Sequence, residues 1–291
     1  MNTEQKKWFF LFLLALTWGS SFILIKKGLL GLSPLQLGSL RTVMSSLFIF
    51  IIGYKSLKTI QNHQWKWIVI TGFLGTFFPS FLFAFAETEV DSGVVSILNS
   101  LVPLNTILIG LAVFKITSTK TQVFGVILGF IGASMLIFNS MELHPDQNYL
   151  YAGFVVLATV MYASSVNIIK YYLQDVKPIA IATGNFVAIV IPAVLVLSFS
   201  NFFTAETFQN DTIYMSIGCV AILSLFGTVM AKIIFNTLIQ LSSPVFASSV
   251  AYLMPLVALL WGLLDGEVFG LNQGLASLLI LLGVYLVNKN A

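Results

Sequence analysis

Residues 92–114 read SGVVSILNSLVPLNTILIGLAVF, an apolar stretch that contains no charged residue and is bounded by Asp91 and Lys115. A helix needs roughly 20 predominantly apolar residues to cross the hydrocarbon core of a bilayer. The stretch is therefore long enough to span a membrane. Its continuous apolar character argues against a β-barrel strand, in which apolar and polar residues alternate.

On both sides of this stretch the pattern repeats, with short polar connections between apolar segments. Of the 291 residues, 58% are hydrophobic and 9% are charged, against about 25% charged in an ordinary soluble domain. This composition excludes a cytosolic globular enzyme and a disordered chain. We predict an all-α membrane protein with ten transmembrane helices, at residues 8–25, 34–54, 67–86, 92–114, 121–138, 149–172, 178–200, 212–238, 244–264 and 271–288.

The lysines of the connections predict how the chain is oriented. With the N-terminus inside, ten lysines fall on the inner side and two, Lys26 and Lys27, on the outer side. Cytoplasmic loops carry the excess of Lys and Arg, so we predict that both termini are cytoplasmic. We expect the protein to reside in the bacterial cytoplasmic (inner) membrane. The inner lysines are Lys6, Lys7, Lys55, Lys58, Lys66, Lys115, Lys120, Lys170, Lys177 and Lys289.

The two halves of the chain match at a nearly constant offset, which is 144 at first and 151 or 152 later. This series predicts a duplication, with repeats at residues 8–138 and 149–288. Each repeat holds five helices, an odd number, so the second repeat would insert upside down, as in many carriers. The matched residues are Ser20-Ser21 with Ser164-Ser165, Lys26 with Lys170, Pro34 with Pro178, Gly75-Thr76 with Gly227-Thr228, Pro103-Leu104 with Pro255-Leu256, Gln122 with Gln273, and Gly132 with Gly283.

Several motifs resemble those of a known family. The segment Trp18-Gly19-Ser20-Ser21-Phe22, the stretch from Pro34 to Arg41, and the stretch from Ser243-Pro244 to Tyr252 with Pro255 and Gly266-Glu267 resemble the EamA family of the drug/metabolite transporter superfamily. The resemblance covers the whole chain as two EamA repeats. It implies a secondary transporter, usually an exporter of small metabolites such as amino acids, with a cavity between the repeats. One departure is Lys115, where the second repeat, like the family, has Glu267.

Two basic residues fall inside predicted helices. An intramembrane cation costs at least about 2.5 kcal/mol on insertion scales, so each is expected to face a cavity, a helix carbonyl or water. Lys232 either lines the pore with Thr228 and Asn236, which share its helix face, or extends its amine to the interface. Arg41 is predicted to have a structural role, capping helix ends or holding a loop near the outer face.

No Asp or Glu lies inside a predicted helix. The superfamily resemblance implies that small cation exporters use a membrane carboxylate to bind both drug and proton. Nothing deep in this chain can do so. An anionic or zwitterionic solute is therefore favoured over a cationic drug.

Polar side chains form stripes that are candidates for the cavity wall. The alternative for each is an ordinary hydrogen bond between helices, which contributes about 0.6 kcal/mol on average. Pro103 and Pro255 lie in the middle of their helices at matching repeat positions, where they would kink the helix or act as hinges. The predicted substrate-binding residues are Trp18, Ser21, Ser96, Asn99, Tyr162, Ser165, Thr228, Lys232, Asn236, Ser248 and Tyr252.

The small residues Gly125, Gly129 and Ala133 share one face of a predicted helix and indicate a close helix contact, within the chain or in a homo-oligomer. Enzyme motifs such as G-x-S-x-G or H-E-x-x-H are absent from the sequence. Its two histidines, His63 and His144, are predicted on opposite sides of the membrane. We therefore expect no enzyme activity, cofactor, metal or nucleic-acid partner.

The predicted function is export of a small-molecule substrate across the bilayer by alternating access. Two rivals stay open. The first is a carrier of nucleotide- or lipid-linked sugars, and the second is a membrane-embedded enzyme of lipid metabolism.

Overall fold

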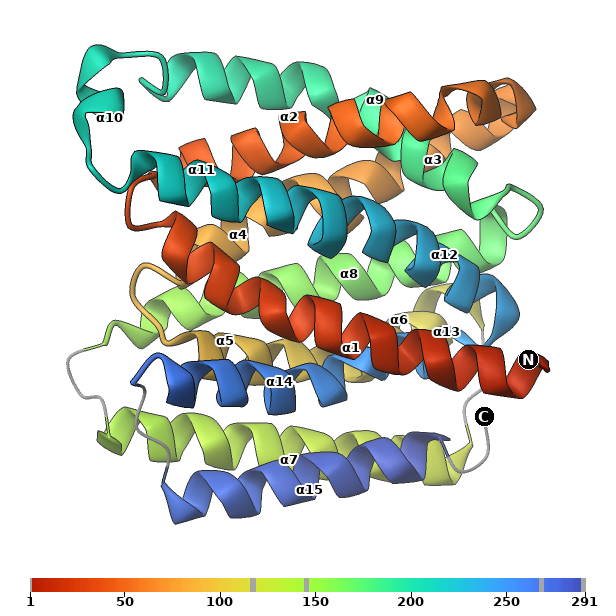
Figure 1. The fold of residues 1–291 in the computed structure, drawn as a ribbon. Coiled ribbons are helices and arrows are strands. Elements are labelled where there is room, and N and C mark those ends of the chain that lie inside the picture. Colours follow the sequence, from red (N-terminus) through yellow and green to blue (C-terminus); the bar gives the residue numbers. More distant parts are fainter. Residues whose placement is uncertain (1, 116–118, 144–146, 267–269, 289–291) are drawn as a thin grey trace.

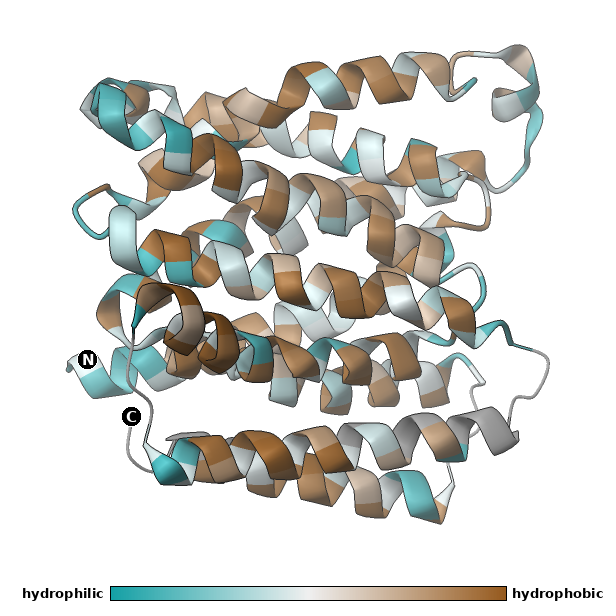
Figure 2. Ribbon diagram, turned by 180° about the vertical axis from the view of Figure 1, so that it is seen from behind, coloured by the Kyte–Doolittle hydropathy of each residue, from teal (hydrophilic) through white to brown (hydrophobic). Residues whose placement is uncertain are grey.

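The computed structural model describes residues 2–115, 119–143, 147–266 and 270–288, and the regular elements within these ranges are all helical. Successive long helices cross the bundle in alternating directions (Figure 1). Figure 2 shows that the hydrophilic residues gather at the two ends of this bundle, with hydrophobic helices between them. The arrangement is that of an integral membrane protein.

Among the described residues, eight helical segments are long and apolar enough to cross a membrane. Two further predicted spans, 121–138 and 271–288, correspond to shorter apolar helices at Lys120–Gly132 and Leu271–Gly283. The all-helical membrane fold is confirmed. The eight segments are Thr3–Gly28, Pro34–Thr59, Asn62–Ala86, Ser92–Phe114, Tyr149–Tyr172, Pro178–Phe199, Ile213–Leu241 and Pro244–Leu264.

Several of the uninterrupted long helices begin where the sequence supplies a capping residue or a proline. Ser33 accepts a hydrogen bond from the backbone of Gln36 and precedes Pro34, the first residue of α2. The uninterrupted helices are α1 (Thr3–Gly28), α2 (Pro34–Gly53), α7 (Lys120–Leu143), α8 (Ala152–Tyr172), α9 (Pro178–Phe199) and α15 (Leu271–Asn288). Short elements at their ends are the 3₁₀ turns Tyr54–Thr59, Asn62–Gln64 and Tyr149–Tyr151, and α10 (Ala205–Gln209).

Four of the membrane-crossing segments are interrupted. Two of them contain a π-helical stretch: Phe73–Phe77 between α3 (Trp65–Gly72) and α4 (Phe78–Ala86), and Leu223–Met230 between α11 (Ile213–Ile222) and α12 (Ala231–Leu241). Single π turns inside α-helices often mark functional sites. A third is broken by the 3₁₀ turn Asn99–Leu101 between α5 (Ser92–Leu98) and α6 (Val102–Phe114), and a fourth at Ser249, between α13 (Pro244–Ser248) and α14 (Val250–Leu264).

Prolines free backbone carbonyls that other helices then use. Proline has no N–H, so the carbonyl four residues earlier loses its helical partner. Pro255 thereby frees the carbonyl of Ala251, which accepts a hydrogen bond of 3.1 Å from Ser100 Oγ. This hydrogen bond therefore links α14, near the predicted bend at Pro255, to the 3₁₀ turn that interrupts the fourth span.

The predicted small-residue face packs within the chain. A β-carbon at Gly283 of α15 would lie 2.6 Å from the carbonyl of Gly125 and 2.9 Å from the N of Gly129, both in α7. The contact is reciprocal, since a β-carbon at Gly132 of α7 would lie 2.9 Å from the carbonyl of Ala276 in α15 and 3.1 Å from the N of Ile280. Both glycines allow a backbone approach that no larger residue would permit.

Candidate functional site

A cavity lies in the middle of the bundle, with about 970 Å³ of space outside the protein atoms, part of it continuous with the surroundings. α1, α2, α8 and the four interrupted segments all contribute to its wall. Ten of the residues singled out in the sequence line it: Trp18, Ser21, Arg41, Asn99, Tyr162, Ser165, Thr228, Lys232, Asn236 and Ser248.

Lys232 is buried in the wall, and its ammonium is held by the first π-helical stretch. Its Nζ donates to the carbonyl of Gly75 at 3.1 Å and to Oγ1 of Thr76 at 2.9 Å. The Gly75 carbonyl is available because it precedes Pro79, which has no N–H, by four residues. Thr228, Lys232 and Asn236 all line the cavity, as their shared helix face predicts.

Arg41 faces the same cavity from α2. Its Nε donates to Oγ1 of Thr228 at 2.9 Å, in the second π-helical stretch. Its backbone carbonyl accepts from Oγ of Ser224 at 3.1 Å. Arg41 thus lies against the cavity wall and contacts the second half of the chain, whereas the sequence predicted a helix cap or a loop contact near the outer face.

Contacts around the cavity come in matched pairs from the two halves. A β-carbon at Gly227 would lie 2.6 Å from Oγ of Ser21, and one at Gly75 would lie 2.5 Å from Oγ of Ser165. These residues correspond at the offsets of 152 and 144 seen in the sequence. α1 therefore meets η6 (Leu223–Met230) in the same way as α8 meets η3 (Phe73–Phe77).

Two aromatic pairs follow the same correspondence. Trp18 and Phe235 meet edge to face with ring centroids 4.9 Å apart, and Trp18 Nε1 donates to the carbonyl of Gly227 at 2.8 Å. Tyr162 and Phe83, the matching residues, have centroids 6.0 Å apart. The first pair is thus the tighter one in this conformation.

Ser96 and Tyr252 lie outside the cavity wall. Ser96 is fully buried, and its hydroxyl donates to the carbonyl of Gly93 at 2.8 Å. Tyr252 packs between α14 and α7, where a β-carbon at Gly129 would lie 3.1 Å from its ring. A solute in the cavity would contact neither residue in the conformation described here. Pro103 and Pro255 are also absent from the wall.

Sequence reasoning missed the partners of the two cations. Thr228 was predicted to line the pore but not to bind Arg41, and the Gly75-Thr76 match indicated a repeat but not a cavity wall, because a π-helical turn cannot be recognised from hydrophobic periodicity. Phe83 is one of several phenylalanines in the third predicted span that could form an aromatic wall, but Phe235 was overlooked, although an offset of 152 pairs it with Phe83.

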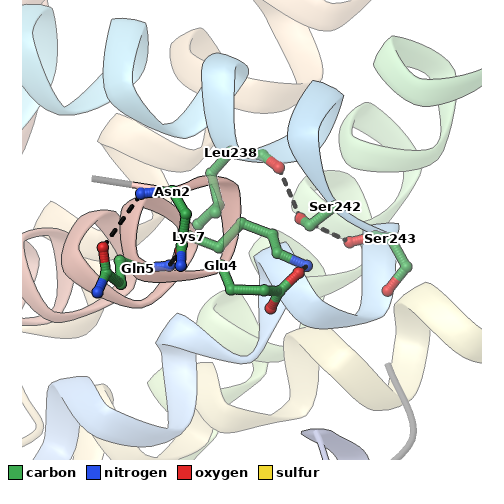
Figure 3. A network of polar contacts seen from close by, with 7 residues as sticks. All are labelled: Asn2, Glu4, Gln5, Lys7, Leu238, Ser242 and Ser243. Carbon is green, nitrogen blue, oxygen red and sulfur yellow. Dashed lines mark hydrogen bonds and ion pairs between the residues drawn. The ribbon is translucent and has the colours of Figure 1, made fainter.

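Polar and aromatic contacts gather at the end of the bundle where α1 begins. Lys7 pairs with Glu4 at 2.5 Å within α1, and Ser242 Oγ donates to the carbonyl of Leu238 at 2.6 Å (Figure 3). Lys170 of α8 donates to the Ser242 carbonyl at 2.7 Å, and Trp8 packs on Phe246. The α12–α13 connection is thereby held against both α1 and α8.

The opposite end of the bundle carries an ion cluster. Lys26 lies 3.1 Å from a carboxylate oxygen of Asp265, and Lys27 also binds that carboxylate. Hydrogen bonding from Lys27, and then from Lys26, holds the pKa of Asp265 below its ordinary value. The cluster ties the end of α1 to the end of α14.

Comparison with known proteins identifies the family. The sequence pattern of the EamA-like transporter family matches residues 5–138 and again residues 150–289. The chain belongs to the EamA-like transporter family. As an EamA-like protein it is a membrane transporter, and the expected resemblance is confirmed.

Relatives of this EamA-like chain carry matching names. A protein of Archaeoglobus fulgidus named "Uncharacterized transporter" is 28% identical over 97% of this chain and 99% of its own length. YedA of Escherichia coli K12, named "Uncharacterized inner membrane transporter", is 27% identical over 95% of this chain and 89% of its own. A crystal structure at 14% identity, covering 97% of this chain and 96% of its own, superposes with a TM-score of 0.72 and shows the same fold.

Proposed function

We propose that this EamA-like protein is a secondary transporter that exports small metabolites such as amino acids by alternating access. The membrane would be the bacterial cytoplasmic membrane, with both termini on the cytoplasmic side. The proposed path is the central cavity, at the junction of two inverted five-helix repeats.

The reciprocal contacts are the observation that carries this proposal. The contact of Ser21 with Gly227 corresponds to the contact of Ser165 with Gly75. The contact of Gly283 with α7 corresponds to that of Gly132 with α15. Such exchange of partners is what a two-fold axis between the halves produces. Because α1 and α8 cross the bundle in opposite directions (Figure 1), the axis would lie in the membrane plane. That relation gives a carrier two similar packings, one open to each side.

Counterflow in proteoliposomes tests the proposal. Vesicles loaded with one unlabelled amino acid should accumulate the same labelled amino acid transiently, whereas empty vesicles should not. Amino acids, nucleotide sugars and lipid-linked sugars would be compared on one preparation. Counterflow of the sugar conjugates alone would favour the rival carrier function, and chemical conversion of a lipid without counterflow would favour an enzyme.

A further inference from the structure

We propose that the cavity recognises its solute by a carboxylate held between the guanidinium of Arg41 and the ammonium of Lys232. A cationic amine without a carboxylate is excluded. This inference rests on the proposed function, because it names the substrate class of the same cavity.

The charges of the wall support the inference first. Arg41 and Lys232 both line the cavity, and no Asp or Glu is among the described residues that line it. Glu87, buried at the end of α4, acts on Arg41 electrostatically but lies outside the wall. Two like charges in a low-dielectric space attract anions and repel amines.

Both cations are held by neutral oxygen atoms. Lys232 Nζ binds a carbonyl and a hydroxyl, those of Gly75 and Thr76. Arg41 binds one hydroxyl through Nε, and its two terminal Nη groups form no hydrogen bond within the described part of the chain. The present bonds have one charged partner, whereas bonds from these cations to a carboxylate would have two charges of opposite sign and a further Coulombic attraction. A solute carboxylate is therefore a better partner than the present ones.

The two cations also converge on one stretch of helix. The partner of Arg41 is Thr228, which lies four residues before Lys232 in the same span and lines the same cavity. A carboxylate has two oxygen atoms and can accept from both cations at once. It would compete with Thr228 for Arg41 and with Thr76 for Lys232, both of which are bonds between the two halves of the chain.

The rest of the wall indicates what the carboxylate is attached to. Aromatic rings of Trp18, Phe22, Phe83 and Phe235 line the cavity beside aliphatic side chains. The amide oxygen of Asn99 is buried with no hydrogen-bond partner among the described residues, so it can accept from an ammonium or a hydroxyl group of the solute. The substrate class is thus a small carboxylate with an apolar body, in which an ammonium is tolerated but not required.

A head-group series on the purified wild-type protein tests the inference. Thermal shift would compare 3-phenylpropionate, L-phenylalanine, L-phenylalanine amide and 2-phenylethylamine, and the matching isobutyl series. The carboxylates of at least one series should stabilise the protein, and the corresponding amide and amine should not. Equal stabilisation by the amide or the amine, or stabilisation by no carboxylate in either series, overturns the inference.

Variants then assign the carboxylate to the two residues. Arg41→Met and Lys232→Met should each weaken carboxylate binding at least tenfold, whereas Arg41→Lys and Lys232→Arg should retain part of it. Lys58→Met removes the same charge from an exposed site and should leave binding unchanged. Elution as a folded monodisperse species is required of each variant. Unchanged binding by folded Arg41→Met or Lys232→Met contradicts the assignment.

Counterflow on the same preparation separates this inference from the proposed function. Carboxylate binding without counterflow would overturn transport and leave the head-group assignment standing. Counterflow of the amines in place of the carboxylates would leave transport standing and overturn the assignment.

Discussion

Replacing Gly283 or Gly132 by alanine should loosen the packing of α7 against α15, and the structure gives the size of the effect. The new β-carbon at Gly283 would lie 2.6 Å from the Gly125 carbonyl, and that at Gly132 would lie 2.9 Å from the Ala276 carbonyl. Ordinary carbon–oxygen contacts begin at about 3.3 Å. The helices must therefore move apart by several tenths of an ångström at either site.

The expected cost follows from two opposing terms. Overpacking of a closely packed contact costs about 1–3 kcal/mol, and alanine regains about 0.8–1.0 kcal/mol over glycine in a helix. Each variant should thus lose up to about 2 kcal/mol of unfolding free energy. Once the helices have separated for the first alanine, the second should cost less, so the double variant should lose less than the sum.

Reversible unfolding of the purified protein in mixed micelles measures these losses. Gly274→Ala in the same helix is the matched control, because a β-carbon there meets no atom within 4 Å. It should be neutral or slightly stabilising. Equal stability of Gly283→Ala and Gly274→Ala, or changes of opposite sign in the two interface variants, would show that the close α7–α15 contact does not limit stability.

Two further predictions concern the ends of the bundle. Lys27 and Lys26 lower the pKa of Asp265. Their ion pairs therefore stabilise the folded protein fully above the ordinary aspartate pKa of about 3.9, and this stabilisation is lost as the pH falls through the lowered pKa. Thermal unfolding from about pH 6 downward should therefore show a smaller acid-induced loss for Asp265→Asn than for the wild type, and equal losses would contradict this. In a Cys219→Ser background, a cysteine at exposed Asp211 should react with an impermeant thiol reagent in intact cells, and one at exposed Lys58 only after permeabilisation. The reverse labelling would show that the predicted orientation is wrong.

Sequence reasoning predicted the helical membrane fold because charge-free stretches of sufficient length leave few alternatives. It also predicted that Lys232 shares a face with Asn236, since both lie in the regular helix α12; Thr228, in the π-helical stretch before it, lines the cavity as well. The partner of Lys232 could not be predicted in this way. It depends on a carbonyl freed by Pro79 in another helix, and so on tertiary packing.

The failures have physical reasons too. Placing both Ser96 and Asn99 in the cavity wall assumes a continuous helix through the fourth span, but the 3₁₀ turn Asn99–Leu101 interrupts that helix. Tyr252 was placed in the cavity by the same assumption, although the helix breaks at Ser249. Arg41 was assigned a role near a helix end because its depth in the membrane was estimated along its own helix alone. Its hydrogen-bond partner, Thr228, lies in a π-helical stretch of another helix.

Alternating access requires that the two ends of the cavity change their access to water in opposite senses. Ile25 and Ile169 correspond at the offset of 144, and both line the cavity. Ile25 lies three residues before the end of α1 and Ile169 three before the end of α8, so they lie toward opposite ends of the bundle.

Two variants are made in a Cys219→Ser background, one with a single cysteine at Ile25 and one with a single cysteine at Ile169. Each is reconstituted in vesicles, and the rate at which its cysteine reacts with a water-soluble thiol reagent is measured. The ligand is the carboxylate that stabilises the protein most in the head-group series. A ligand can only shift an equilibrium between states that it binds differently. Saturating carboxylate should therefore raise the reaction rate at one cysteine and lower it at the other. Parallel changes at both, or no change in protein shown to bind the carboxylate, would contradict a carrier with two alternating openings.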